Sequence, residues 1–354
     1  LIRAIVDVVQ PLPGQTIGDP ACGTGGFLLA AHDYVVQHNT LDREEHRFLR
    51  DQAFRGTEIV DNTARLCAMN LFLHGIGGAD LNATPPVEVK DALLSEPTEK
   101  VDVVLANPPF GKKSSVTVIG EDGRVSAETE SVTRDDFWAT TSNKQLNFVQ
   151  HIRSMLRTGG QAAVVVPDNV LFEGGAGETI RRRLLQECNV HTLLRLPTGI
   201  FYAQGVKANV LFFERRPASA EAQTKDLWVY DFRTNQRFTL KTRPLSRSDL
   251  DGFVEAYSAA DRGERVESEQ FKRWTYEEIA ERPGFNLDIW ASVVDESLSD
   301  PASLPAPEVI AAQIVEDATA GIEAFAAVAA ELAALAEPEP DGEDAVEALL
   351  GDDA

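Results

Sequence analysis

The residues with the clearest chemical potential form a glycine-rich turn near the start of the chain. Residues 18–28 read GDPACGTGGFL; they follow a short strand-like stretch and open a helical pattern. Glycines let the backbone turn sharply and approach a ligand where a side chain would collide. No Gly-Lys-Ser/Thr follows, so the turn does not match a phosphate-binding loop. Asp19 would repel a phosphate and attract an ammonium group, which favours a cofactor with an amino-acid end, such as S-adenosylmethionine.

Two further acids follow the next expected strands. Glu58 lies in the sequence GTE, where an acid at the end of the second strand commonly accepts hydrogen bonds from ribose hydroxyls. Asp91 lies in VKDAL and could accept from the exocyclic amine of an adenine. A plain turn residue or a helix cap stays an open alternative for Asp91.

The tetrapeptide Asn107-Pro108-Pro109-Phe110 directly follows the apolar run VDVVLA. This places it at the carboxyl edge of the sheet, where open α/β sheets bind ligands. Adjacent prolines fix the backbone and lack N–H donors, so the turn presents carbonyl acceptors. An amide beside such carbonyls can hold an –NH2 group by both hydrogens, which suits alkylation of a planar amine. A purely structural turn is the alternative.

A parallel sheet is needed to bring these residues together. Apolar runs alternate with helical patterns over the first two thirds of the chain, which is typical of α/β proteins, and runs such as QAAVVV are apolar throughout, like strands buried on both faces. The sequence therefore predicts a doubly wound, mostly parallel sheet. The expected strands are residues 16–18, 55–57, 87–89, 101–106, 161–166, 192–196 and 210–214. The expected helices are residues 26–37, 61–75, 146–158 and 177–187, with Gly75 and Gly159 as C-terminal caps.

Taken in order, several segments resemble the N6-adenine DNA methyltransferases that form the modification (M) subunits of type I restriction-modification systems. The segments are DPACGTGGFL, GTE, NPPFG, LNFVQHI, GGQAAVVVPDNVLF, GIFYAQGVKANVLFFER, DFRTN and GFNLDIW. NPPF distinguishes the chain from the NPPY proteins that methylate a glutamine in release factors. The serine-led SPPY or SPPW of many N4-cytosine enzymes is absent as well.

The resemblance implies a class I methyltransferase fold and methyl transfer from S-adenosylmethionine to the N6 amine of a flipped-out adenine. Glu58 would then contact the ribose and Asp91 the adenine of the cofactor. Asn107 and the carbonyl of Pro108 would bind the target amine, with Asn107 also beside the cofactor. The turn residues that would line the methionine end are Asp19, Ala21, Cys22, Gly23, Thr24 and Gly25. The remaining residues of the catalytic turn are Pro109 and Phe110.

The target base is expected to stack between two aromatic rings. The resemblance implies Phe110 as one ring and Phe201, in GIFYAQGV, as the other. For Phe201 a role as a core aromatic beside Ile200 and Tyr202 stays open.

The family resemblance also concerns partners. It implies that a separate specificity (S) subunit reads the DNA sequence, and it leaves open a restriction (R) subunit and a second M subunit. The family carries a helical domain and a Phe-Thr-Pro segment ahead of the first helix. This sequence opens at Leu1, inside that helix, so we expect that part to be missing here.

Other functions stay open at this point. The same cofactor site would serve a methyltransferase acting on RNA or on a protein amide nitrogen. The chain could instead be a catalytically silent scaffold subunit. A Rossmann-type protein for another nucleotide is disfavoured, because Asp19 lies where a pyrophosphate would bind.

Charge is unevenly distributed along the chain. The 354 residues have a net charge of −23, and residues 283–354 contain 17 acids and no Lys or Arg. An acidic protein is poorly suited to unaided nucleic-acid binding, so we expect a basic partner or local basic patches. The candidate patches are residues 112–113, 181–183 and 215–216 and the group Lys241, Arg243 and Arg247, although such runs are more often solvated surface.

The cysteines and the hydropathy favour a cytoplasmic protein without a metal. Cys22, Cys67 and Cys188 are too widely spaced for a zinc site or a disulfide framework. No apolar run approaches the roughly 20 residues that cross a bilayer. No secretory leader opens the chain, so no membrane partner is expected.

The chain is expected to have four parts. Residues 1–217 would form the catalytic domain and residues 218–300 its C-terminal extension, with strands at 227–231 and 237–240 pairing together. Residues 111–143 look like a functional loop or lid. Residues 301–336 would form a linker and a long helix that docks on a partner or packs on its own domain, because apolar residues recur there at steps of three and four. Residues 337–354 would be an acidic, disordered tail.

Overall fold

The computed structural model describes residues 1–77, 85–110, 115–119, 125–129, 131–201, 206–233, 238–240, 243–258 and 260–289. The chain separates into two compact units, Leu1–Val293 and Val294–Ala354, and all described residues belong to the first. The expected docking helix and acidic tail therefore lie outside the described residues. No helix within the described ranges is long and apolar enough to span a membrane.

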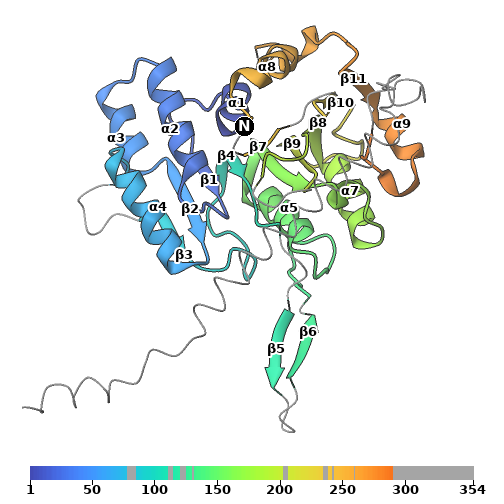
Figure 1. The fold of residues 1–354 in the computed structure, drawn as a ribbon, viewed down its shortest axis with the longest axis horizontal. Coiled ribbons are helices and arrows are strands. Elements are labelled where there is room, and N and C mark those ends of the chain that lie inside the picture. The colour runs from blue at the N-terminus through green and yellow to red at the C-terminus, as the bar shows by residue number, and fades with distance from the viewer. Residues whose placement is uncertain are drawn as a thin grey trace, which may run out of the picture. The chain divides into compact units, whose positions relative to one another are not determined.

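A nine-stranded sheet forms the centre of the described unit (Figure 1). Its strand order is β11-β10-β8-β9-β7-β4-β1-β2-β3. The strands are β1 (Ile17–Asp19), β2 (Phe54–Glu58), β3 (Val87–Val89), β4 (Val101–Ala106), β7 (Leu156–Pro167), β8 (Cys188–Arg195), β9 (Ala208–Arg215), β10 (Asp226–Asp231) and β11 (Phe271–Thr275). The prediction of a mostly parallel sheet is confirmed, with β9 antiparallel to both neighbours and β11 antiparallel to β10.

The direction of winding reverses at the middle of the sheet. From β1 the chain adds β2 and then β3 on one side, and it then returns to place β4 and β7 on the other side of β1. Ligands of open α/β sheets bind at such a switch point, outside the carboxyl ends of the strands. The switch point here lies between β1 and β4.

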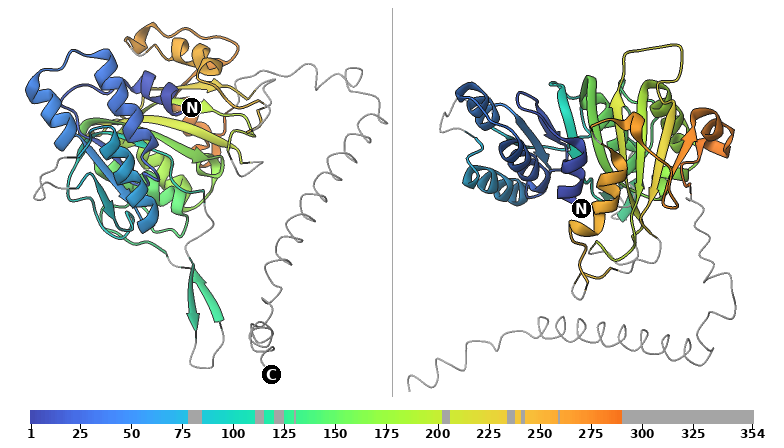
Figure 2. Two further views of the ribbon diagram at one scale, coloured as in Figure 1. Left: turned by 60° about the vertical axis from the view of Figure 1, so that its left-hand side comes forward. Right: turned by 90° about the horizontal axis from the view of Figure 1, so that it is seen from above.

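Helices cover both faces of this sheet (Figure 2). The first apolar cluster joins one face to α1, α2, α4 and α8, and the second joins the other face to α5, α6, α7 and α9. The helices are α1 (Ile2–Val9), α2 (Gly26–His38), α3 (Arg43–Asp51), α4 (Asp61–Leu73), α5 (Lys144–Met155), α6 (Asn169–Phe172), α7 (Ala176–Glu187), α8 (Asp251–Tyr257) and α9 (Tyr276–Glu281). Short 3-10 turns are η1 (Ser248–Leu250), η2 (Arg262–Glu264) and η3 (Pro283–Phe285).

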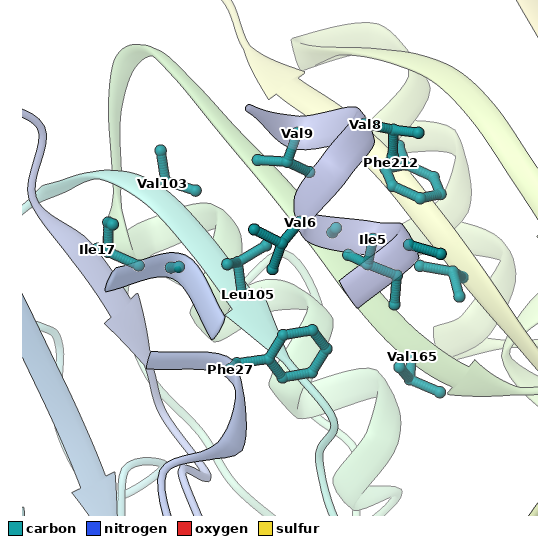
Figure 3. Close-up of a cluster of buried hydrophobic side chains, with 14 of the residues drawn as sticks. Ile5, Val6, Val8, Val9, Ile17, Phe27, Val103, Leu105, Val165 and Phe212 are labelled. Carbon is teal, nitrogen blue, oxygen red and sulfur yellow. The ribbon is translucent and has the colours of Figure 1, made fainter. Parts of the chain in front are cut away.

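Strand β4 is apolar apart from Asp102, because both of its faces are covered. Val103 and Leu105 belong to the first cluster, whereas Val104 and Ala106 belong to the second. Successive side chains of a strand point to opposite faces, so both faces of β4 are covered. Figure 3 shows the first cluster, in which residues of α1 gather with Leu105 and side chains of the neighbouring strands.

Glycine was predicted to cap the C-terminal ends of two helices, and the structure confirms one of these caps. Gly75 has a φ of 75° and its N–H donates to Phe72, so it closes α4 as predicted. The prediction for Gly159 was wrong, because α5 ends at Met155 and β7 begins at the next residue. Gly159, with a φ of 87°, lies inside that strand. The sharp helix-to-strand passage needs no glycine cap, since Leu156 is already extended.

Two other segments differ from the sequence-based expectation. Residues 227–231 do form a strand, but β10 pairs with β8 and β11 instead of with residues 237–240. Of the latter, residues 238–240 are not a strand. The segment expected as a loop at 111–143 contains a two-stranded hairpin, β5 (Ser115–Ile119) with β6 (Val125–Thr129). Short β-branched runs there were hidden by the surrounding glycines and charges.

A buried arginine fastens the end of the described chain to the sheet. Arg195 ends β8 and is fully buried; its guanidinium pairs with Asp288 at 2.6 Å and with Asp168 at 3.3 Å and donates to the carbonyl of Ile289 at 3.0 Å. A buried cation is tolerated only when it is paired in this way. Residues 284–289 are therefore tied to the catalytic sheet by residues distant in sequence.

Candidate active site at the carboxyl edge of the sheet

The sheet order places the predicted functional residues in one row. Adjacent strands β3, β2, β1 and β4 run parallel, and their carboxyl ends lead to Asp91, Glu58, Asp19 and Asn107 in turn. Neighbouring strands are about 4.8 Å apart. The row can therefore contact one extended ligand that crosses the switch point.

The glycine-rich turn packs against the end of β2. The N–H of Cys22 donates to the carbonyl of Thr57 at 3.0 Å, and the N–H of Gly23 donates to Oε2 of Glu58 at 3.0 Å. Gly25 caps α2 with a φ of 89°, and a Cβ there would lie 3.0 Å from the Cys67 sulfur. Only glycine meets both conditions. The turn is thus held close to the second strand.

Asp19 is a buried carboxylate without a cation. Its side chain is 2% exposed, and its Oδ1 accepts a hydrogen bond from the N–H of Ala21 at 3.0 Å. No Lys, Arg or His within the described ranges forms an ion pair with it. Burial raises the pKa of Asp19 to about 7, and the nearby charge of Glu58 adds to this rise. The free-energy cost of ionising such a buried carboxylate is best offset by a ligand that carries a positive charge.

The other two acids of the row are held by backbone donors. Glu58 accepts from Gly23 through one oxygen and from the N–H of Val60, at 2.9 Å, through the other. Each oxygen keeps a second lone pair for a ligand hydroxyl. Asp91 accepts from the N–H of Leu93 at 2.9 Å, so it does form a local turn, as its alternative interpretation predicted. This bond occupies one lone pair of one oxygen.

The turn after β4 faces an aromatic partner. Asn107 is exposed, whereas Pro108 is buried behind it. The rings of Phe110 and Phe201 meet edge to face, with centroids 5.5 Å apart and planes at 78°. The two predicted stacking residues are thus brought together from segments 91 positions apart. A base between two rings needs about 7 Å, two carbon contact distances, so the rings must separate to admit one.

Sequence reasoning missed the residues that hold this edge together. Gln145, buried in the first turn of α5, donates its amide to the carbonyl of Pro109 at 3.3 Å. Asn143 caps that helix through the N–H groups of Gln145 and Leu146. The signal was a run of polar side chains, TSNKQ, directly before the helix expected at 146–158.

A second missed residue, Arg134, holds the Asp91 end of the row in place. Its guanidinium binds both oxygens of Asp136, at 2.9 and 2.6 Å, and donates to Nδ1 of His151 at 2.9 Å. It also reaches the carbonyl of Leu93 at 3.4 Å, two residues after Asp91. Burial, followed by the charge of Arg134, lowers the pKa of His151 to about 3, so this ring is neutral and accepts. Its contact with Asp136 is local, but His151 and Leu93 are remote in sequence, and no local pattern predicts those two contacts.

An apolar wall lies next to the same corner. Phe137 packs with Ala21, Ala92, Leu93 and Phe148. They come from the glycine-rich turn, from the two residues after Asp91, from the segment before α5 and from α5 itself. Such a wall suits the flat face of a heterocyclic base.

Two thiols lie beneath the glycine-rich turn. The sulfurs of Cys22 and Cys67 are 3.7 Å apart, and both residues are buried. The hydrogen bond with Cys67, followed by burial, raises the pKa of the Cys22 thiol. The Cys22 thiol is therefore protonated near neutral pH and acts as packing for the turn.

The fold, with its row of three acids and an asparagine at the carboxyl ends of β1 to β4, is that of an α/β methyltransferase. Residues 1–300 match the family model described as N-6 DNA Methylase, and the chain belongs to this family. The family prediction made from the motifs is confirmed.

Known relatives place the chain more narrowly. It is 39% identical to the methylase subunit of the type I restriction enzyme EcoKI from Escherichia coli (strain K12), over 94% of this chain and 67% of that subunit. The StySJI methylase subunit from Salmonella typhimurium (strain LT2) shows the same identity and coverage. The crystal structure of the EcoKI M protein matches with a TM-score of 0.70 and 35% identity, over 99% of this chain and 74% of that one. The chain is thus a type I methylase subunit, an N6-adenine DNA methyltransferase.

Proposed function

We propose that the row at the carboxyl edge binds S-adenosylmethionine across β1, β2 and β3 and presents it to an adenine of DNA held by the turn after β4. The observation that carries this proposal is the position of Asn107 beside the strand of Asp19, with Phe110 and Phe201 facing each other at the same edge. When bound, the cofactor supplies an activated methyl group.

The residues present fit that cofactor. The unpaired, buried Asp19 would accept the ammonium group of the methionine end, while Gly23 and Gly25 allow close approach of the backbone. Glu58 would accept from the ribose hydroxyls, and Asp91, with the wall around Phe137, would receive the adenine. The remaining residues assigned to this site are Ala21, Cys22 and Thr24.

The catalytic turn acts by position and by hydrogen bonding. Asn107 and the carbonyl of Pro108 would hold the two hydrogens of the target amine, so that its lone pair points toward β1. Pro109 fixes the turn, and Gln145 holds the Pro109 carbonyl. The base must leave the duplex to reach this edge, at a cost of a few kcal/mol, which stacking on Phe110 and Phe201 offsets.

The partners follow from the relatives and from the charge. A separate specificity subunit would select the DNA site, since the chain is acidic overall. Residues 301–336 would dock on that subunit, and loss of the complex on deleting the chain after residue 301 tests this role. The further assignments, a catalytic domain at 1–217 with an extension at 218–300 and a tail at 337–354, belong to the same proposal. A cytoplasmic location agrees with three free, buried cysteines.

The test follows a labelled methyl group. Labelled S-adenosylmethionine and DNA are incubated with the protein, with and without its specificity subunit, and the DNA is digested to nucleosides. Label in N6-methyladenine that depends on the specificity subunit supports the proposal, and label in protein, in RNA or in another base contradicts it. Asn107→Ala should abolish transfer while cofactor affinity is kept. The matched control is Asn39→Ala, at the end of α2, which should retain activity.

A further inference from the structure

Two of the basic runs seen in the sequence converge on the sheet edge opposite the catalytic turn. Arg183 of the run 181–183 and the pair Arg215-Arg216 line one pocket, together with Arg153 of α5. Arg216 also lines an adjoining pocket with Lys225, Arg262 and Arg265. The basic tract is defined by Arg153, Arg183, Arg215, Arg216, Lys225, Arg262 and Arg265.

Topology separates this tract from the catalytic turn. Strands β7, β8 and β10 begin at the tract, and the antiparallel β9 ends there with Arg215. The turn at Asn107 follows the other end of β4, which runs parallel to β7. A strand of six residues spans about 20 Å, so one phosphate cannot contact both places.

The carboxylates of the tract do not neutralise its arginines. Glu187 pairs with both Arg153 and Arg183, and it also accepts from the indole of Trp138. Glu214 is likewise shared between Arg216 and Arg262. One carboxylate balances one guanidinium, so each of these clusters keeps a positive charge. Lys225 is paired with Glu221 at 3.4 Å, and Asp226 lines the second pocket, so the excess positive charge of the tract comes from its arginines.

Two further arginines of the tract have carbonyl partners instead of carboxylates. Arg215 donates to the carbonyl of Leu156 at 2.6 Å. Arg265, 8% exposed, donates to the carbonyls of Tyr257 and His191, and its Nη2 has no hydrogen-bond partner among the described residues. The excess positive charge also affects His191. Burial lowers the pKa of this residue, and the charges of Arg262, Arg265 and Arg216 lower it further.

We infer that the basic tract binds the phosphodiester backbone of duplex DNA, as a contact separate from the flipped adenine. Six of its seven cations are arginines, whose planar forks match phosphate oxygens in pairs. The two pockets adjoin through Arg216, so they offer successive positions to a chain of regularly spaced anions. The contact would be independent of base sequence, because phosphate contacts position a protein without reading bases.

The test uses the full chain and a fluorescent duplex, with binding followed by anisotropy over a range of salt. The double variant Arg183→Gln/Arg216→Gln removes two charges from side chains that are 53% and 42% exposed, so the fold is retained. We expect weaker binding to every sequence and a salt slope shallower by about 2, one unit for each phosphate contact. The matched control Arg50→Gln/Arg65→Gln removes two charges from ion-paired, exposed arginines of α3 and α4 and should leave the slope unchanged.

Three results would overturn the inference. An equal loss in both double variants would mean that only net charge matters. An unchanged slope in the tract variant would mean that these arginines meet no phosphate. Competition by polyglutamate at the same charge concentration as DNA would point to an acidic protein partner. The test is independent of the proposed function, because at saturating duplex and with the specificity subunit present the rate of methyl transfer should be equal in the tract variant and the wild type.

Discussion

The buried carboxylate of Asp19 should make the protein without cofactor less stable as pH rises. The folded state raises the pKa of Asp19 from 3.8 to about 7, mainly by burial. Between these two values the folded chain keeps a proton that the unfolded chain has released, so the free energy of unfolding falls as pH increases through this window. A shift of about 3 units corresponds to about 4 kcal/mol, fully expressed above pH 7.

Asp19→Asn isolates this effect. The amide oxygen can still accept from Ala21, at the place where Oδ1 now lies 3.0 Å from the N–H, but the variant carries no charge at any pH. At pH 5, about one pH unit above the unfolded pKa of 3.8, the variant should already be the more stable by about 1.5 kcal/mol. At pH 8 the variant should be the more stable by up to about 4 kcal/mol, the full penalty of the buried charge. Tryptophan fluorescence during urea unfolding, at pH steps from 5 to 8, measures the difference.

Cofactor binding should show the opposite trend with pH. An ammonium group binds the ionised carboxylate, so the Kd of S-adenosylmethionine should rise about tenfold for each pH unit below 7. Methylthioadenosine lacks the amino-acid end, and its Kd should be independent of pH. The reasoning is refuted by parallel stability curves for wild type and Asp19→Asn, or by equal pH dependence of both ligands in the wild type.

Three further changes test other parts of the structure. Gly25→Ala would place a Cβ at a φ of 89° and against the sulfur of Cys67, so it should lower the free energy of unfolding by about 1 to 2 kcal/mol and weaken cofactor binding. The control Gly14→Ala has a φ of 80° but no atom of the described residues near its Cβ, so it should show only the cost of the backbone conformation and leave the cofactor Kd unchanged. Arg195→Met leaves Asp168 and Asp288 without their cation, so it should lower the free energy of unfolding by about 3 to 5 kcal/mol in urea titrations. A loss below about 1 kcal/mol would contradict a stabilising role of this buried ion cluster. Phe201→Ala should slow DNA methylation with cofactor Kd unchanged, and an unaltered kcat/KM for DNA would argue against its stacking role.

The row of site residues could be predicted because each member lies at, or one or two residues after, the carboxyl end of an expected strand. Parallel strands end at one edge, so the positions of Asp19, Glu58, Asp91 and Asn107 in the sequence already implied their proximity. Whether these residues contact the cofactor and the base stays a prediction. The role of Phe201 could be predicted less clearly, because an aromatic residue next to Ile200 is equally compatible with a place in the hydrophobic core.

The supporting residues could not be predicted, because their partners are remote in sequence. Arg134 contacts His151 and Leu93, and its own neighbourhood has no helical or strand period. The order of the sheet was hidden for the same reason. Residues 210–214 read as one more buried strand, and nothing local shows that β9 runs antiparallel. The pairing of β10 with β11 depends likewise on residues that lie 41 to 49 positions downstream.

The position of β9 has a consequence for synthesis on the ribosome. In the sheet β9 lies between β7 and β8, but it is made after both of them. The facing edges of these two strands therefore have no hydrogen-bond partner until residues 208–215 have emerged. At 5 to 20 residues per second this interval is brief, yet open strand edges are where nascent chains pair wrongly. The sheet is therefore completed only when β9 inserts between β7 and β8, antiparallel to both of them.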